Sequence, residues 1–171
     1  MTRTRTITWH DPADLRDRMS SLSGLETMHA IASGILPAPP VAELIGFAPS
    51  LVLPGRIVFA YEPREEHYNP IGSVHGGIVT TVLDTVMGCA VHTLLDSGVG
   101  YTTLELKVNF VRPVTLQSGL LRAEGSVVHA GGTVMTAEAR LLDAQDRLYA
   151  HASSTCLVFG AERTKEQPVA A

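Results

Sequence analysis

Asp84 is the only acidic or basic residue, histidines apart, between Ile71 and Leu95. A carboxylate with so few polar neighbours has little aqueous surface to occupy, and a carboxylate held away from bulk water is a candidate for acid or base chemistry. The competing interpretation is a solvated polar residue on an amphipathic helix, the common position of a single aspartate. The uncharged surroundings favour a functional role.

A second group of candidates precedes this aspartate. Ser73 is a possible helix N-cap, and the backbone amides of Gly76 and Gly77 would be unshielded at a positive helix end, where they can polarise a carbonyl oxygen. The alternative is a plain helix start with glycines that ease a tight turn. Asn69 could donate to the same oxygen or serve as a turn residue. His75 could be catalytic, but a structural role in the loop is favoured.

The spacing of these groups has a geometric consequence. Asp84 follows Gly76 by eight positions, so the two lie roughly 12 Å apart along one helix. One carbonyl group cannot touch both. Two antiparallel copies of the helix, packed about a twofold axis, would bring Gly76 of one chain close to Asp84 of the other. The sequence therefore predicts a homodimer with two shared sites.

Residues 76–95 are predicted to form one long buried helix. Its apolar stripe, expected to face a sheet, consists of Val79, Val82, Leu83, Val86, Ala90 and Leu94. The opposite face is small apart from the carboxylate and consists of Gly77, Thr81, Asp84 and Gly88. Glycine inside a helix costs about 1 kcal/mol relative to alanine, so a close approach by another helix or a substrate is expected on this face.

The remaining segments must form the framework around that helix. Helical spacing over 11–35 predicts an amphipathic helix that is broken near Gly24 and ended by prolines. A helical turn is expected over 41–44, followed by two strands joined at Pro54-Gly55. Residues 101–159 predict four antiparallel strands, the first with Leu104, Leu106, Val108 and Phe110 facing a core. The expected fold is α+β, with one long central helix wrapped by an antiparallel sheet of about six strands and an extra N-terminal helix.

Length and composition narrow the class of protein. One domain is expected over residues 12–159, with flexible ends at 1–11 and 160–171. A net charge of -4 without long single-sign runs argues against nucleic acid as a partner. Cys89 and Cys156 lie in apolar segments and no secretory signal is visible, which predicts a cytoplasmic protein. Asp84 and His92 within the apolar run 78–95 favour a buried helix over a membrane span.

The motif Asn69-Pro70-x-Gly72-x-x-His75-Gly76-Gly77, followed by Asp84, resembles the signature of hotdog-fold thioesterases of the phenylacetate-pathway (PaaI-like) type. The resemblance covers about residues 25–159. It implies hydrolysis of acyl- or aryl-coenzyme A, with coenzyme A as part of the substrate and with no separate cofactor. It also implies that the Gly76 amide and Asn69 hold the carbonyl, and that Asp84 of the partner chain acts as general base or nucleophile.

The resemblance assigns further residues. A hydroxyl at the start of the strand after the helix would hold the attacking water; Thr103 matches best and Thr102 is the alternative. Where relatives often carry basic residues against coenzyme A phosphates, this chain has a turn containing Gly131 and Gly132, so Arg112 is a substitute candidate for that contact. Relatives also suggest a homotetramer, a dimer of dimers. An acyl-carrier-protein thioester is a second possible substrate.

Other chemistries find less support in the sequence. The histidines show no zinc spacing, and no serine nucleophile elbow or phosphate loop is present, so no metal is expected. Two rival functions stay open: a hotdog-fold hydratase or dehydratase with a catalytic histidine, and a non-catalytic module that binds acyl thioesters. The identity of the acyl group, and the choice between water activation and direct attack by Asp84, are not encoded in any visible motif.

Overall fold

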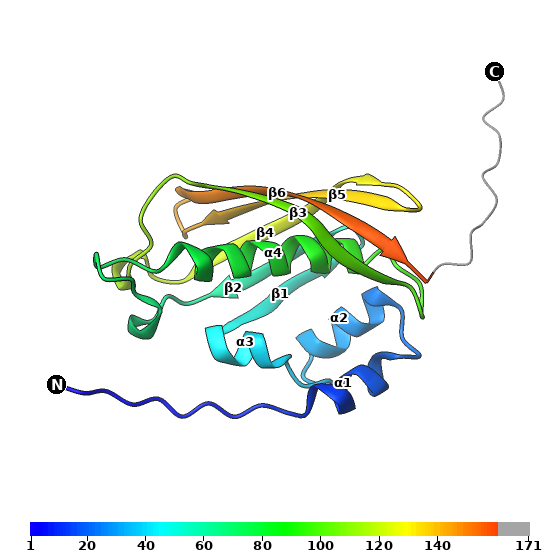
Figure 1. Cartoon of the computed structure of the whole chain (residues 1–171), viewed down its shortest axis with the longest axis horizontal. Helices are drawn as coiled ribbons and strands as arrows, with labels where there is room; N and C mark the ends of the chain where they lie inside the picture. Colours follow the sequence, from blue (N-terminus) through cyan, green and yellow to red (C-terminus); the bar gives the residue numbers. More distant parts are fainter. Residues whose placement is uncertain (161–171) are drawn as a thin grey trace, which may run out of the picture.

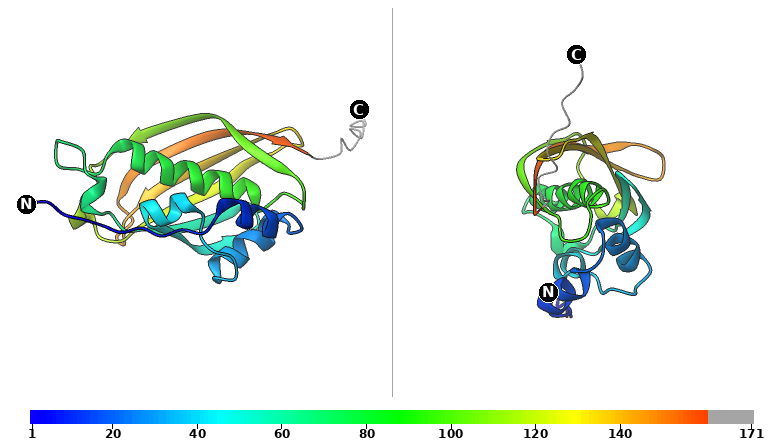
Figure 2. Two further views of the ribbon diagram at one scale, coloured as in Figure 1. Left: turned by 60° about the horizontal axis from the view of Figure 1, so that its bottom comes forward. Right: turned by 90° about the vertical axis from the view of Figure 1, so that its right-hand side faces the viewer.

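The structure is a computed structural model and describes residues 1–160. A curved, six-stranded antiparallel sheet in the order β1-β2-β4-β5-β6-β3 wraps around one helix, α4 (Figure 1). The bounds are β1 Phe47–Leu53, β2 Arg56–Tyr61, α4 Gly76–His92, β3 Gly100–Phe110, β4 Leu121–Ala130, β5 Val134–Leu142 and β6 Leu148–Phe159. Seen end-on, the sheet curls over α4 (Figure 2). The expected hotdog architecture is confirmed.

The central helix α4 buries its apolar stripe against the concave face of the sheet. Val82, Leu83 and Val86 are fully buried, and each such side chain contributes about 1.5–3 kcal/mol through burial. The predicted end at Leu95 is wrong, because α4 ends at His92 and Leu94 is 39% exposed beyond it. Past His92 the chain continues in tighter turns, in which the amides of Leu94 and Leu95 donate to carbonyls three residues back, and the Leu95 carbonyl accepts from the amide of Gly24.

Three short helices precede the sheet: α1 Pro12–Met19, α2 Gly24–Ala32 and α3 Pro40–Ile45. The break expected near Gly24 is present, because Ser23 and Glu26 form a capping box that starts α2 anew. The helix α3 ends at Gly46, whose φ of 81° places it in the left-handed region. These helices lie on the β1 side of the sheet, away from β3 (Figure 1). They lengthen the core without covering the candidate residues of α4.

The strand β3 departs from the simple alternation predicted for it. A register shift between Thr103 and Glu105 leaves Leu104 as a bulge that is 58% exposed, and Phe110 at the strand's end is 56% exposed. Only Leu106 and Val108 of the predicted apolar face pack against the core. The prediction that all four residues face the core is therefore wrong for Leu104 and Phe110. The bulge matters because it sets the direction of Thr103.

The N-terminal segment runs along the outside of the molecule. The Arg5 guanidinium donates to the carbonyl oxygens of Glu43 and Leu44 and pairs with Glu66, and Arg3 pairs with Glu65. The flexibility expected for residues 1–11 stays a prediction, and the tail from residue 161 lies outside the described residues. Among residues 1–160, no helix has the length and apolar character needed to cross a membrane.

Candidate active site

Asp84 lies in the middle of α4, on the side that faces the beginning of β3. Its Oδ1 accepts a hydrogen bond of 3.0 Å from the hydroxyl of Thr103. Thr102 is exposed, because successive side chains of a strand point to opposite faces, and its hydroxyl makes no hydrogen bond to any of residues 1–160. Of the two threonines suggested by sequence, Thr103 is therefore the one that contacts the carboxylate.

The surroundings of Asp84 are poor in water and rich in weak acids. Burial raises the pKa of the Cys89 thiol to about 12, and the negative charge of Asp84 adds to that rise. Burial and Asp84 also raise the pKa of Cys156. The pKa of Tyr101 lies well above its ordinary value, chiefly through burial. These three groups therefore stay protonated at neutral pH. Asp84 itself is partly buried.

The face of α4 that carries Asp84 is approached closely, as its glycines predict. A Cβ on Gly88 would lie 2.8 Å from the Tyr101 ring and hydroxyl oxygen. The close neighbour at this position is a side chain of β3 in the same protomer, whereas the sequence pointed to another helix or a substrate. Gly77, on the same face at the start of α4, is exposed.

The helix start presents one free amide. His75 is the N-cap of α4, and its Nδ1 accepts a hydrogen bond of 2.9 Å from the Gly77 amide. The prediction of Ser73 as N-cap is wrong, since its hydroxyl is engaged by Asn69 at 3.2 Å. Among residues 1–160, no acceptor lies within hydrogen-bonding reach of the Gly76 amide. The donor available to a carbonyl oxygen is therefore Gly76, while Gly77 is already bonded.

The loop before α4 is held by side-chain hydrogen bonds. Asn69 Oδ1 accepts from the amides of Ile71 (3.1 Å) and Ser73 (3.2 Å), so the carboxamide oxygen stabilises the turn. Its nitrogen has two N–H groups, of which one serves Ser73. The turn role considered for Asn69 is thus present, and one N–H remains for a ligand.

A buried histidine ties this loop to the sheet. The backbone carbonyl of His67 accepts from the His75 amide at 2.8 Å. The Nδ1 atom of the His67 ring accepts from the Arg64 amide (3.3 Å) and lies 3.1 Å from the hydroxyl of Tyr61, on β2. Burial lowers the pKa of His67. No local sequence pattern marks this packing role of His67.

A cavity of about 330 Å³ opens beside the helix start and brings together Asn69, Gly76 and Arg112. Arg112 is fixed at this cavity, because its Nη1 donates to the Leu148 carbonyl at 2.6 Å and its guanidinium lies 5.6 Å from the centre of the Tyr149 ring. The remaining lining residues are Ser73, Val74, Val79, Phe110, Val111, Pro113, Val114 and Tyr149. No pattern in the sequence indicates that the end of β3 and the start of β6 meet here.

Other candidates lie apart from this cavity. Asp84 does not line it, and eight helical residues place Asp84 roughly 12 Å from Gly76 within the chain. Gly131 and Gly132 lie in the turn between β4 and β5, at the end of the sheet where β3 begins, whereas Phe110 of the cavity ends β3. One protomer thus separates the carboxylate, the free amide and the glycine turn.

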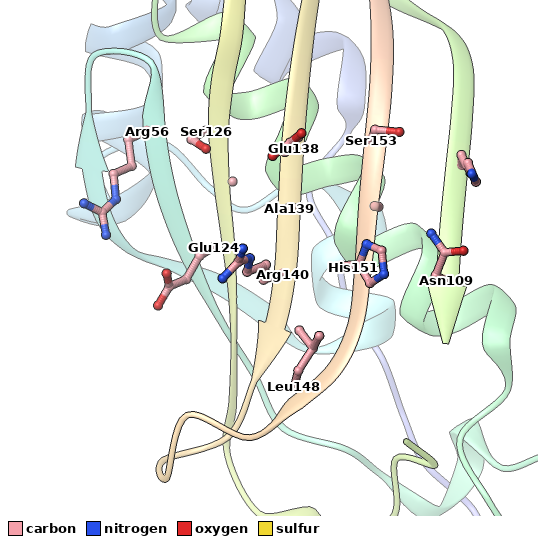
Figure 3. A pocket seen from close by; sticks show the side chains of 13 residues that line it. Arg56, Asn109, Glu124, Ser126, Glu138, Ala139, Arg140, Leu148, His151 and Ser153 are labelled. Atoms are coloured by element: carbon pink, nitrogen blue, oxygen red, sulfur yellow. The ribbon is translucent and has the colours of Figure 1, made fainter. Parts of the chain in front are cut away.

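A larger hollow of about 790 Å³ lies on the outer face of the sheet (Figure 3). Its charges are of both signs, with Arg56, Lys107 and Arg140 near Glu124 and Glu138. Its other lining residues include Asn109, Ser126, Leu148, His151 and Ser153, and none of the candidate residues reaches it. Among residues 1–160 no group of three or more histidine, cysteine or acidic side chains is placed to hold a metal ion. The expectation that no metal is needed stays a prediction.

Comparisons with known proteins agree on one family. The family model described as thioesterase superfamily matches residues 71–150. A Saccharolobus solfataricus protein named as an esterase is 34% identical over 113 residues, covering 66% of this chain and 76% of that protein. Human acyl-coenzyme A thioesterase 13 is 27% identical over 63 residues, covering 37% of this chain and 44% of its own length.

A solved structure extends the similarity to three dimensions. The phenylacetic acid degradation-related protein of Ralstonia eutropha JMP134 superimposes with a TM-score of 0.70 at 30% identity, covering 76% of this chain and 98% of that one. The matched model begins at Ile71, before α4, and ends within β6, so it includes Gly76, Asp84 and Thr103. With relatives of this similarity matched over most of their length, the chain belongs to the thioesterase superfamily and is a thioester hydrolase of the hotdog fold.

Proposed function

We propose that this protein hydrolyses acyl- or aryl-coenzyme A thioesters to a free acid and coenzyme A, with Asp84 as general base or nucleophile. The observation that carries the proposal is the 3.0 Å hydrogen bond between Thr103 and Asp84, which fixes a partly buried carboxylate on the central helix. The human relative is named as an acyl-coenzyme A thioesterase, which supports coenzyme A as the leaving group.

The proposed reaction needs one base and one oxyanion donor. Thr103 holds Oδ1 of Asp84, and among residues 1–160 no donor occupies Oδ2, which is free to take a proton from water. The hydroxide formed attacks the carbonyl carbon, and the Gly76 amide and the spare N–H of Asn69 stabilise the resulting oxyanion. The C–S bond then breaks and the thiolate recovers the proton from Asp84. In the alternative route, Oδ2 attacks directly and water cleaves the anhydride.

The two halves of this site come from two chains in the proposal. The roughly 12 Å along α4 between Gly76 and Asp84 exceeds the reach of one thioester carbonyl. Antiparallel packing of two α4 helices would place each Asp84 near the partner's free amide. A homodimer with two shared sites is therefore part of the proposed function. The homotetramer suggested by relatives stays a prediction that a solution mass would test.

The first test removes the charge from the carboxylate. Asp84→Asn preserves the shape of the side chain and should lower the rate of thiol release from acyl-coenzyme A esters by about 10²–10⁴-fold. Asp96→Asn, an exposed aspartate beyond the end of α4, is the matched control and should leave the rate unchanged. Near-normal turnover in Asp84→Asn with a native thermal transition would refute the assignment.

The second test separates the Gly76 amide from the space around it. Gly76 is the first residue of α4 and follows a residue with ψ of 135°, a position where proline is compatible with a helix. Gly76→Pro should therefore keep the fold but delete the free N–H. Gly76→Ala keeps the N–H and adds a Cβ 3.1 Å from the Phe110 ring. Removing one oxyanion donor typically costs about 10²–10³-fold in kcat, so the proline variant should lose much more activity than the alanine variant.

Mixing two inactive variants tests whether the sites are shared. In a heterodimer of Gly76→Pro and Asp84→Ala chains, one of the two shared sites has both groups intact. Random association should then restore about a quarter of the wild-type sites. If each site lay within a single chain, the mixture would stay as inactive as its components.

The rival functions give different results in the same experiments. A hydratase or dehydratase would lose activity in His75→Ala and keep it in Asp84→Asn. The structure engages His75 Nδ1 as the cap of α4, which favours a structural role. A binding module would bind acyl-coenzyme A saturably without releasing thiol. Parallel assays with an acyl-carrier-protein thioester would distinguish the two carriers.

A further inference from the structure

The side chains that line the cavity beside Gly76 differ in how firmly packing and hydrogen bonds hold them. Tyr149 is 4% exposed and its hydroxyl donates to Asp143 at 3.3 Å, while Val79 and Val114 are buried in the core. These walls cannot move without disturbing the packed interior. Phe110, by contrast, is 56% exposed at the end of β3 and its ring has no hydrogen-bonding group to fix it. Phe110 is therefore the aromatic wall of the cavity that is least constrained by the core.

The Phe110 ring lies directly over Gly76, the residue with the free amide. Its Cζ is 3.1 Å from the point where a Cβ on Gly76 would lie, with Cε1 at 3.4 Å. A thioester whose oxygen accepts from the Gly76 amide must extend one of its two arms past this ring. The volume of about 330 Å³ is at the lower end of the range for small-molecule sites, ~300–1,000 Å³. A compact group fits beneath Phe110, whereas a long chain would have to displace it.

The lining favours the acyl arm over the pantetheine arm of coenzyme A. Seven of the eleven lining residues are apolar or aromatic, and Arg112 is the only charged one. The pantetheine arm carries two amide groups, and burying an amide without a partner costs roughly 1–3 kcal/mol. The side-chain donors and acceptors of Asn69 and Ser73 are largely used by each other and by the loop. An apolar acyl group has no amide that would need a hydrogen-bond partner in the cavity.

We propose that Phe110 is a specificity-determining residue that limits the size of the acyl group, so that this enzyme prefers compact acyl thioesters to long-chain ones. The inference rests on the proposed function, because it assigns the acyl arm to the cavity beside the Gly76 amide. Truncation of Phe110 enlarges the cavity and removes the barrier to a long chain. Each methylene that gains or loses its place in an apolar pocket changes kcat/KM by about 10-fold or more.

The test compares acetyl-, benzoyl-, octanoyl- and hexadecanoyl-coenzyme A with wild type, Phe110→Ala and a matched control. Phe159→Ala is that control, because Phe159 is 51% exposed, lies over Gly100 and is at the opposite end of β3. Wild type should favour the compact esters. The ratio of kcat/KM for hexadecanoyl over benzoyl should rise at least tenfold in Phe110→Ala and stay constant in Phe159→Ala. Phe110→Trp, which narrows the cavity, should shift the preference further toward acetyl.

Several results would overturn the inference. Equal ratios in Phe110→Ala and Phe159→Ala would show that Phe110 does not select the acyl group. If Phe110→Ala raised the inhibition constant of free coenzyme A and changed kcat/KM equally for all four esters, the pantetheine arm would lie in the cavity instead. Absence of thiol release from every ester in wild type would refute the proposed function and this inference together. Hydrolysis by wild type without a size preference would refute the inference alone.

Discussion

Replacing Thr103 with valine removes the hydrogen bond that holds Oδ1 of Asp84 while keeping the shape of the side chain. The bond is 3.0 Å long and joins a neutral hydroxyl to a carboxylate on the central helix. Hydrogen bonds to charged groups contribute about 1.5–3 kcal/mol. If this orientation is needed in the transition state, the rate should fall by about 10- to 150-fold, since each 1.36 kcal/mol corresponds to a factor of ten.

The distribution of this loss between kcat and KM is informative. Thr103 contacts Asp84 and does not line the cavity beside Gly76, so kcat should fall while KM changes little. Thr103→Ser keeps a hydroxyl and should retain most of the rate. Thr102→Val is the matched control, because Thr102 is the exposed neighbour whose hydroxyl has no hydrogen bond in the structure. A full rate in Thr103→Val, or a loss in Thr102→Val alone, would refute this account of how Asp84 is positioned.

Two further predictions concern stability. Gly88→Ala should lower the free energy of unfolding in urea by about 1–2 kcal/mol, because overpacking against the Tyr101 ring (about 1–3 kcal/mol) exceeds the helical gain of alanine. Gly132→Ala is the control, because a Cβ there meets nothing within 4 Å. A stabilised Gly88→Ala would contradict the close contact. Burial lowers the pKa of His67 and of His92 below the ordinary 6.5, so the unfolded chain binds protons that the folded chain does not. The contribution of these two histidines to stability should be complete above pH 6.5 and fall as the pH drops toward the folded-state pKa values. Between pH 7.5 and 5, the midpoint of thermal unfolding should change less steeply with pH in His67→Gln than in wild type. An unchanged slope would speak against a buried neutral His67.

Much of the fold follows from local pattern. The strand segments after residue 100, the break near Gly24 and the long apolar helix with Asp84 at its centre were all predictable, because alternation, capping residues and helical spacing are encoded locally. The family resemblance assigned Thr103 to hold the attacking water, and its hydrogen bond to Asp84 was not predicted. Nothing in the spacing of 19 residues between them fixes the contact, since it depends on the bulge that follows Thr103.

The errors have tertiary causes. A serine is normally the better N-cap, yet Ser73 is bonded to Asn69, and this leaves His75 to cap α4. The apolar run continues to Leu95, but α4 ends at His92, where the buried Thr93 hydroxyl donates to the Ala90 carbonyl and accepts from the Gly55 amide. The cavity beside Gly76 was invisible because its walls are contributed by segments far apart in sequence, among them Phe110 and residues at the start of β6.

The two halves of the proposed site are held by different kinds of interaction. Asp84 and Thr103 lie on elements packed by the core, where the neighbouring side chains on α4 are fully buried. The Gly76 amide depends on a loop fixed by polar contacts of His67, Asn69 and His75, with the helix itself setting the direction of the N–H. A preorganised amide needs no reorganisation when charge develops on the carbonyl oxygen. Each chain therefore builds both a fixed carboxylate and a fixed donor by itself, and in the proposed homodimer a second chain would bring them within reach of one thioester.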